Sequence, residues 1–247
     1  MTMFTRSLIT LALTTSISAF ATPSFDSLTI RATNINAPSA DTYNTVSVDP
    51  VSGVRTDTQN YASDVNGWEL KWSEQLSDHT YWFAGYRNDR TSFTENAQMY
   101  QPSPITIMRF SNQTSVSTRQ YSLGAGYIFK LSDRTTVDVN GSMGRLKLKG
   151  TEFTSYTSEN NYQTFVQSGH SYATVAGYNA RLRHEFSDDF EFYASVGGER
   201  WYADEDDTIS VQTVGVNYFI FDETAISVEY GKYDDEERTA VGVHFTF

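Results

Sequence analysis

Two acidic clusters are the first feature of the sequence that suggests chemistry. They consist of Asp204, Glu205, Asp206 and Asp207, and of Asp234, Asp235, Glu236 and Glu237. Carboxylate oxygens are preferred ligands of Ca²⁺ and Mg²⁺. We expect the clusters in consecutive, neighbouring hairpins, where eight negative charges would favour a bound cation. The alternative is a pair of solvated loop tips, and apart from this possible divalent cation we expect no cofactor.

A basic trio forms the second feature. Arg145, Lys147 and Lys149 occupy alternate positions and therefore share one face of an extended strand. If the strand keeps its phase, these side chains point outward at headgroup height, where they could contact lipopolysaccharide phosphates. If a bulge at Gly144 shifts the phase, Leu146 faces the lipid and the basic residues face inward. The sequence leaves both arrangements open.

The histidines do not suggest a catalytic site. His79, His170, His184 and His244 are spread along the chain. Nucleophilic or acid–base catalysis needs a base, a nucleophile and an orienting group within reach of one another. No local motif of this kind surrounds any of the four. We therefore expect a protein that is not an enzyme, with a hydrolase as the weakest alternative.

The overall composition excludes several classes of protein. The chain has 247 residues, no cysteine, and 18 Lys and Arg against 30 Asp and Glu, which gives a net charge of −12. A disulfide framework and a cysteine-ligated metal are excluded. Nucleic acid is not an expected partner, because the charge balance is acidic. Aromatic residues nevertheless make up 15% of the chain, which is unusual beside its low hydrophobicity.

The N-terminal segment has the pattern of a secretory signal. Arg6 precedes an apolar stretch rich in Thr and Ser, and Ala19-Phe20-Ala21 has the form of a signal peptidase site. We expect residues 1–21 to be a cleaved signal peptide and residues 22–247 to form one domain. No later apolar run is long enough for a membrane-spanning helix.

Most of the remaining chain alternates with a period of two residues. Between Gln120 and Leu131, odd positions are apolar or aromatic and most even positions are small or polar, as expected for a β-strand. Related segments bring the predicted number of strands to ten. The predicted strands are 28–33, 68–76, 82–89, 120–131, a strand starting near 136, 172–186, 192–202, 211–221, 226–233 and 239–247.

The connections between these strands differ at the two ends. Short polar turns at 76–80, 131–135, 186–190 and 221–224 alternate with long polar stretches at 35–66, 90–115 and 150–171. This asymmetry, together with charged residues inside strands and aromatic residues at strand ends, is typical of membrane barrels. The sequence therefore predicts an all-β, up-and-down antiparallel transmembrane β-barrel of about ten strands. A soluble β-sandwich is the alternative.

The last strand carries a family resemblance. Residues 241–247 end on an aromatic residue, with Gly242, Phe245 and Phe247 at the matching positions. This segment resembles the C-terminal recognition strand of bacterial outer-membrane β-barrel proteins, the class of small OmpA-like and porin-like barrels. The resemblance implies a multi-pass protein of the bacterial outer membrane, with membrane lipid and the barrel-assembly machinery as partners.

Ten strands leave little free bore, so we expect charged side chains to pair across the interior. The expected members of this network are Glu69, Lys71, Arg87, Asp89, Arg181, Arg183, Glu185 and Glu229. Glycines on the same face either leave room for a narrow channel or allow close packing. These glycines are Gly85, Gly124, Gly126, Gly177, Gly197, Gly215 and Gly231.

The long polar stretches contain scattered Tyr and Phe, a composition typical of recognition loops. We therefore expect a structural or surface-recognition role with a largely filled lumen, and contact through the outer loops with lipopolysaccharide, a host or neighbouring cell surface, or phage. A narrow porin-like channel for small solutes is the alternative function, and an outer-membrane hydrolase is the third.

Overall fold

The computed structural model describes residues 24–36, 43–49, 54–62, 65–102, 105–158, 161–202, 207–234 and 236–247. The predicted signal peptide lies outside these residues. Almost all of the described chain is β-strand. No described helix is long and apolar enough to cross a membrane. The strands are β1 Ser27–Asn36, β2 Tyr43–Val48, β3 Arg55–Ala62, β4 Val65–Ser77, β5 Thr80–Pro102, β6 Ile105–Ser132, β7 Thr135–Ser158, β8 Asn161–Ser187, β9 Phe190–Tyr202, β10 Asp207–Phe221, β11 Thr224–Tyr233 and β12 Glu236–Thr246.

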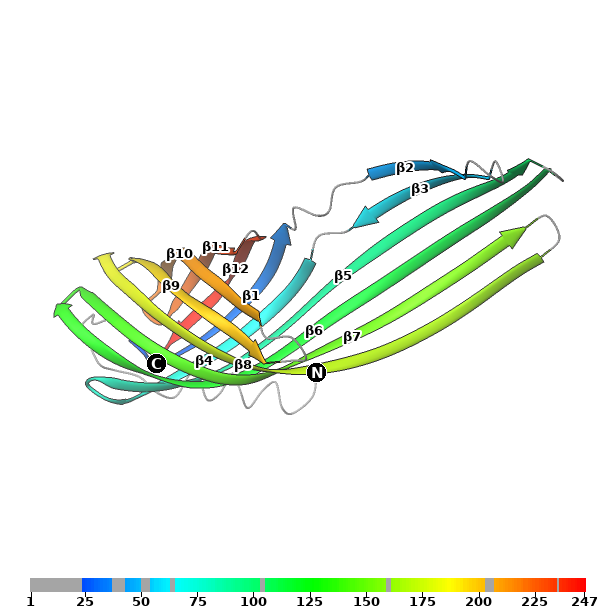
Figure 1. The fold of residues 1–247 in the computed structure, drawn as a ribbon. Coiled ribbons are helices and arrows are strands. Elements are labelled where there is room, and N and C mark those ends of the chain that lie inside the picture. The colour runs from blue at the N-terminus through cyan, green and yellow to red at the C-terminus, as the bar shows by residue number, and fades with distance from the viewer. Residues whose placement is uncertain are drawn as a thin grey trace, which may run out of the picture.

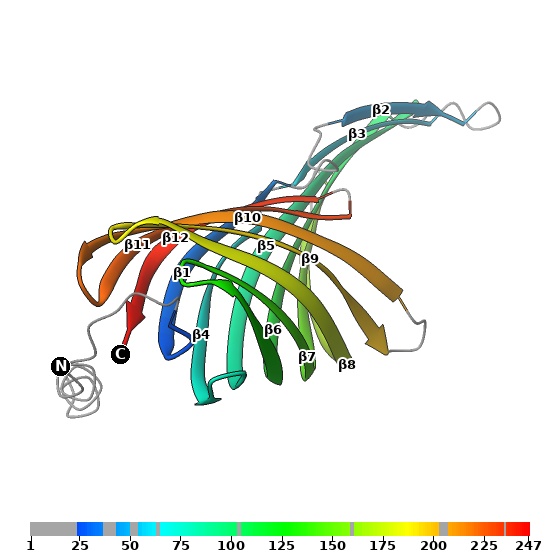
Figure 2. The same ribbon diagram turned by 90° about the vertical axis from the view of Figure 1, so that its left-hand side faces the viewer.

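Ten of these strands close into a barrel (Figures 1 and 2). The ring runs β1, β4, β5, β6, β7, β8, β9, β10, β11, β12, and all its pairings are antiparallel. The first and last strands meet, with Ser27 opposite Thr246 and Asn36 opposite Glu237. The prediction of an up-and-down antiparallel barrel of ten strands is confirmed.

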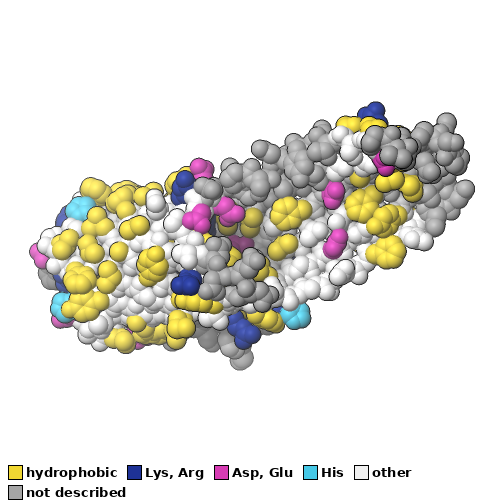
Figure 3. All heavy atoms as spheres, in the orientation of Figure 1, with side chains coloured by type: hydrophobic (Ala, Val, Ile, Leu, Met, Phe, Trp, Pro, Cys, Tyr) yellow, Lys and Arg dark blue, Asp and Glu magenta, His cyan; other side chains and the backbone are white. Residues whose placement is uncertain are grey.

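The two faces of the barrel wall differ as the alternation predicts. On β6, Leu123 is 61% exposed on the outside, whereas Ile128 on the inner face is 1% exposed. On β7, Met143 is 65% exposed on the outside and Asp138 is fully buried. Figure 3 shows apolar side chains spread over the outside of the barrel, with few charged groups among them. The exterior therefore suits hydrocarbon, and the interior is polar.

The short turns gather at one end, which we call the turn end. They lie at 78–79, 133–134, 188–189 and 222–223. Aromatic residues cluster there on the outer face, including Trp72 against Trp82 with ring centroids 5.3 Å apart. Phe186 likewise packs near Phe190 and Phe192. Such a cluster is typical of an interfacial girdle.

At the opposite end, β5, β6, β7 and β8 continue far beyond the rest of the wall (Figure 1). Their lengths are 23, 28, 24 and 27 residues, against 13 for β9. Pairing of β8 with β9 begins only at Thr174 and Tyr202. We call the projecting part the extension; it comprises β2, β3 and residues 93–102, 105–114, 152–158 and 161–171 of β5 to β8.

The extension corrects the predicted loops. Much of 35–66, 90–115 and 150–171 is ordered β-sheet, and β2–β3 form a hairpin that pairs with β5 from Phe93 to Tyr100. The ladder between β5 and β6 runs to Pro102 without a register shift. These segments gave no alternation because both faces of the extension are polar over much of their area. Pairing with a neighbouring strand, which composition does not reveal, holds them extended.

Candidate functional site

The centre of the lumen holds a network of buried ion pairs. Arg31 donates from Nη1 to Glu69 at 3.2 Å and to Glu229 at 2.8 Å, and from Nη2 to the hydroxyl of Tyr193 at 2.7 Å. Arg238 forms a second ion pair with Glu69. The four charged side chains come from β1, β4, β11 and β12, and their exposure is between 5 and 18%. Their charges compensate one another where an unpaired charge would be costly.

Two further pairs lie closer to the turn end. Arg181 donates from Nε to Asp138 at 2.9 Å, and the hydroxyl of Tyr81 donates to the same carboxylate at 2.5 Å. Arg183 donates from Nη2 to Glu191 at 2.6 Å. The first pair joins β8 to β7 and the second joins β8 to β9, so they brace one side of the wall.

Six members of the expected network take part in these contacts or in the Arg87–Asp89 ion pair on β5. They are Glu69, Arg87, Asp89, Arg181, Arg183 and Glu229. Pairing does not hold for Lys71 and Glu185, for which the described residues offer no ion pair. The ammonium of Lys71 instead lies 4.8 Å from the ring centroid of Phe83.

Four further residues of the network were not among its expected members: Arg31, Asp138, Glu191 and Arg238. Arg31 and Asp138 stand in alternating segments, so their inward direction was readable even though their partners were not. Glu191 and Arg238 lie one residue before the predicted starts of their strands. Drawing those boundaries one residue earlier would have placed both on the inner face.

Three lumen glycines face aromatic rings. A Cβ at Gly126 would lie 2.4 Å from the ring of Tyr81, one at Gly124 would lie 2.3 Å from Phe83, and one at Gly215 would lie 2.3 Å from Tyr193. The absence of side chains at these positions lets the rings lie flat against the wall. At these positions, close packing uses the space that a channel would need.

The segment before β1 folds into the turn end of the lumen. Phe25 is 2% exposed and packs with Tyr81, Phe83 and Ile128. The guanidinium of Arg183 lies 4.8 Å from the Phe25 ring centroid and donates to the carbonyl of Ser24 at 3.0 Å. We call residues 24–26 the plug.

Above the plug, an interior cavity of about 270 Å³ remains among polar side chains. Glu69, Lys71, Gln120, Asn140 and Arg181 are among its lining residues. The cavity has a mixed lining of both charges, which suits water and small polar solutes better than an apolar ligand.

The acidic clusters are described only in part. Asp204, Glu205, Asp206 and Asp235 lie outside the described residues, and the side chain of Asp207 does too. Asp234 has a positive φ of 52° and accepts hydrogen bonds from the amide and hydroxyl of Ser210, both at 2.7 Å. These bonds lower the pKa of the Asp234 carboxyl.

Glu236 and Glu237 are exposed. No group of three potential metal ligands occurs among the described residues. The divalent cation stays a prediction, because most of the carboxylates that would bind it lie outside this part of the chain.

The basic trio points outward. The register of β7 with both neighbours is continuous from Thr136 to Lys149, with no shift at Gly144. Leu146 is 1% exposed and packs inward, so the first arrangement is the one present and the alternative with a bulge at Gly144 does not occur. Arg145 and Lys147 both lie over the ring of Tyr172, at 4.6 and 5.5 Å from its centroid. Their binding to lipopolysaccharide stays a prediction.

The C-terminal residues lie at the seam between first and last strands. A Cβ on Gly242 would lie 1.9 Å from the carbonyl oxygen of Ile30, so only glycine allows β12 to approach β1 this closely. Phe245 faces outward opposite Leu28, and Phe247 is 39% exposed. Their role as an assembly signal stays a prediction.

The described histidines lie in separate environments. His244 is buried and shares a hydrogen bond of 2.8 Å with Thr29, while His184 shares one of 2.9 Å with Thr135 on the outside. His79 lies in a turn and His170 lies on the outer face of β8. The expectation that the protein is not an enzyme stays a prediction.

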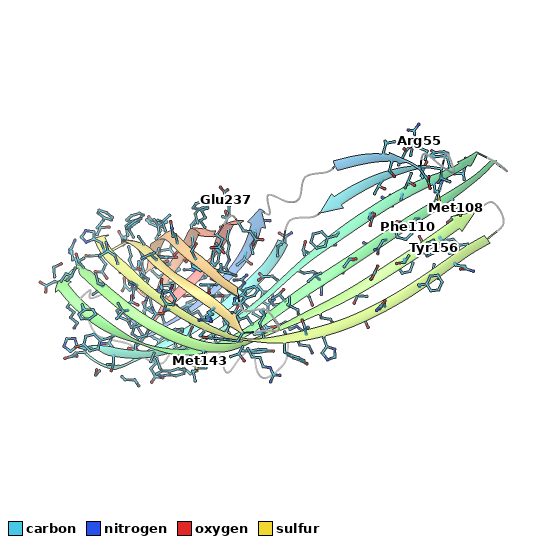
Figure 4. The ribbon with its side chains drawn as sticks, viewed as in Figure 1. Arg55, Met108, Phe110, Met143, Tyr156 and Glu237 are labelled. Carbon is cyan, nitrogen blue, oxygen red and sulfur yellow. The ribbon has the colours of Figure 1, made fainter. Side chains whose placement is uncertain are left out.

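The extension carries a surface of Met and aromatic side chains that are far apart in the sequence. Met99 lies opposite Met108, the rings of Phe110 and Tyr156 are 5.2 Å apart, and Tyr156 meets Phe165 edge-on at 5.9 Å. We call these five residues the Met–aromatic strip; Figure 4 shows Met108, Phe110 and Tyr156 close together on the extension.

All five side chains of the Met–aromatic strip lie on the face that continues the inner wall of the barrel. Tyr156 is 47% exposed and Phe165 55%. The strip borders a hollow of about 590 Å³, which also includes Thr58 and Ala97. Apolar groups exposed together in this way mark contact surfaces. The scattered aromatic residues were visible in the sequence, but their common face depends on the pairing of four strands, β5 to β8.

No family model matches the sequence, and no match is found among curated proteins. Among solved structures, the translocator domain of autotransporter NalP from Neisseria meningitidis is similar at 12% identity and a TM-score of 0.40, covering 99% of this chain and 95% of that one. The NanC porin is similar at 10% identity and a TM-score of 0.42, covering 89% of this chain and 100% of that one.

The outer membrane protease OmpT from Escherichia coli gives 12% identity, a TM-score of 0.43, and coverage of 90% of this chain and 94% of that one. At these identities the likeness concerns the fold alone. The closed ring, its polar interior and its apolar exterior define the class: this chain is an antiparallel β-barrel of the transmembrane type. One fold of this kind hosts unrelated activities, so the role must be argued from the molecule's own surfaces.

Proposed function

We propose that the protein is a non-enzymatic barrel of the bacterial outer membrane that presents the extension as a recognition surface. The apolar exterior supports insertion in a bilayer, since Leu123, Met143 and Val196 are 61, 65 and 59% exposed on the barrel wall. With short turns on the periplasmic side, as in other barrels of this class, the extension projects from the cell.

The observation that carries the proposal is the Met–aromatic strip on a paired sheet. Tyr and Phe provide large contact areas at a low cost in side-chain entropy, and Met adapts to irregular surfaces. Because the sheet is already ordered, a partner binds without the entropy loss of fixing a long loop. The expected partners are host or neighbouring cell surfaces and phage, which meet the extension first.

A narrow channel for small solutes is the second candidate, and the interior cavity of about 270 Å³ favours it. The ion pairs of Arg31 and Arg238 and the plug oppose it, because they occupy the lumen at two levels. A barrel of ten strands has little bore to spare for such side chains.

Planar-bilayer recordings separate the two candidates. Purified wild-type protein is expected to give no stable unitary current, and a Phe25→Ala variant with a disordered plug is expected to give brief, noisy openings at most. A stable, reproducible wild-type conductance would favour the channel over a recognition barrel with a filled lumen.

A binding screen tests recognition directly. Wild-type protein in lipid nanodiscs is applied to a panel of glycans, immobilised cell-surface proteins and phage particles. A variant with Met108, Phe110 and Tyr156 changed to Ser should lose at least tenfold in affinity for the bound probe. Phe153→Ser alters the opposite face of β7 and serves as the matched control. Equal binding by both variants would contradict a role for the strip.

A further inference from the structure

A cluster of cations covers the outside of the wall where the extension leaves the barrel. It consists of Arg90 on β5, Arg119 on β6, and Arg145, Lys147 and Lys149 on β7, and we call it the basic patch. The register places Arg119 directly opposite Lys147, and it places Arg90 and Lys149 on either side of Ser117. Alternation along each strand directs all five side chains to the outer face.

The patch lacks compensation from the part of the chain that the structure describes. None of the five side chains makes an ion pair there. The nearest acids in sequence, Asp89 and Glu152, alternate onto the inner face. Like charges directly opposite each other destabilise a sheet, and Arg119 with Lys147 is such a pair. An anion from outside the chain would therefore stabilise this arrangement.

The position of the patch selects the kind of anion. Tyr121 lies opposite Arg145 and Tyr172 lies opposite Lys147, and the ring of Tyr172 contacts the cations of both Arg145 and Lys147. One step further toward the turn end, Leu123 faces Met143 on the apolar wall. Two residues along a strand span roughly 6.7 Å. The cations thus stand level with two tyrosines and directly above the apolar surface, which is the height of lipid headgroups.

We infer that the basic patch binds the phosphate groups of a phosphorylated glycolipid, the lipopolysaccharide of the outer leaflet. The inference rests on the membrane placement of the proposed function but not on the Met–aromatic strip. Side chains directly opposite in a sheet have Cβ atoms about 5 Å apart, so Arg119 and Lys147 can grip one phosphate together. Arg145 can contribute a bidentate contact, and Tyr121 and Tyr172 offer rings to the sugar or acyl region.

The test compares lipid binding by three proteins in phospholipid nanodiscs. The patch variant carries Arg119→Gln, Arg145→Gln and Lys147→Gln. The control carries Lys232→Gln, another outward cation that lies opposite Glu237 and near the β11–β12 link. The probes are bisphosphorylated lipid A and the same lipid after enzymatic removal of both phosphates. Native mass spectrometry measures the bound fraction, and heat-dependent gel mobility verifies folding of each variant.

Wild type and control should bind phosphorylated lipid A equally, and the patch variant should bind at least tenfold more weakly. Equal binding by the folded patch variant would overturn the inference, as would equal binding of the dephosphorylated lipid. Inorganic phosphate at the lipid concentration should not compete; full competition would identify free phosphate as the ligand and overturn the lipid assignment. A barrel that failed to enter nanodiscs would instead contradict the proposed function.

Discussion

The same four strands, β5 to β8, build two regions with different rules. In the barrel, β6 alternates between exposed apolar residues such as Leu123 and inward residues such as Ile128. In the extension, Ile107 and Met108 are both 39% exposed, and polar residues occupy both faces of much of the sheet. Alternation of apolar and polar residues therefore reflects the medium on each side of a strand, whereas pairing with neighbouring strands determines that a segment is a strand.

The two regions also differ in the solvent exposure of their ion pairs. Ion pairs in the lumen of the barrel are enclosed, as with Arg183 and Glu191, whose side chains are 6 and 2% exposed. In the extension, Arg55 and Asp57 are paired at 2.8 Å with 55 and 30% exposure. The Asp57 carboxylate raises the pKa of Arg55 through this contact, but water and salt can replace it.

Removing one buried charge should have the largest effect. Glu191 accepts hydrogen bonds from Arg183 at 2.6 Å and from Asn217 at 2.7 Å. Glu191→Ala should lower the free energy of unfolding by about 3–5 kcal/mol, because Arg183 is left buried without its partner. Tryptophan fluorescence during urea unfolding in detergent micelles measures the change.

Asp57→Ala is the matched control in the extension and should leave the urea midpoint unchanged. If both variants unfolded at the wild-type midpoint, enclosed ion pairs would not stabilise the barrel more than exposed ones. The proposed difference in stabilisation between ion pairs of the barrel and ion pairs of the extension would then be wrong.

A methyl group at the seam should have an intermediate effect. Gly242→Ala places a Cβ 1.9 Å from the carbonyl oxygen of Ile30 and should cost about 1–3 kcal/mol through backbone displacement. Gly169→Ala in the extension meets no atom within 4 Å and should be neutral. The yield of folded protein after refolding into detergent without any assembly factor, read from heat-dependent gel mobility, measures both effects. Equal yields of the two variants would mean that β1 and β12 can move apart at this position without loss of stability.

Loss of a ring in the extension should have the smallest effect. Tyr156→Ala removes contacts with Phe110 and Phe165, each worth roughly 0.5–1.5 kcal/mol. Amide hydrogen exchange should quicken in the upper parts of β6, β7 and β8 and stay unchanged in the barrel. Exposed Thr157→Ala is the control. Faster exchange throughout the barrel would show that the two regions unfold as one unit.

The sequence was sufficient for the barrel because hydrocarbon imposes a rule on it. Every strand in the apolar layer needs one apolar face toward the lipid and one polar face toward the lumen. Short turns such as 131–135 mark where the chain reverses between two strands. Even β1, the least distinct segment, was found at 28–33 within the observed Ser27–Asn36.

The extension and the ionic partners could not be derived in the same way. Segments 90–115 and 150–171 meet water on both sides, so no periodicity distinguishes strand from loop. The partners of Arg31 depend on how far β1 is staggered against β4 and β11 around the ring, which is a property of the closed barrel. The sequence shows that Arg31 faces inward, but it does not show that Glu69 and Glu229 lie within hydrogen-bond distance of it.

Continuity of the long strands has a mechanical consequence. β6 is one continuous strand of 28 residues, which at ~3.3 Å per residue gives a contour length of about 90 Å. Its ladders with β5 and β7 show no slip between the tip and the turn end apart from the last step at Lys130 and Ser132. A pull on the tip therefore loads many backbone hydrogen bonds at once in shear. Tension from outside would reach the membrane-embedded wall directly, without a hinge to absorb it.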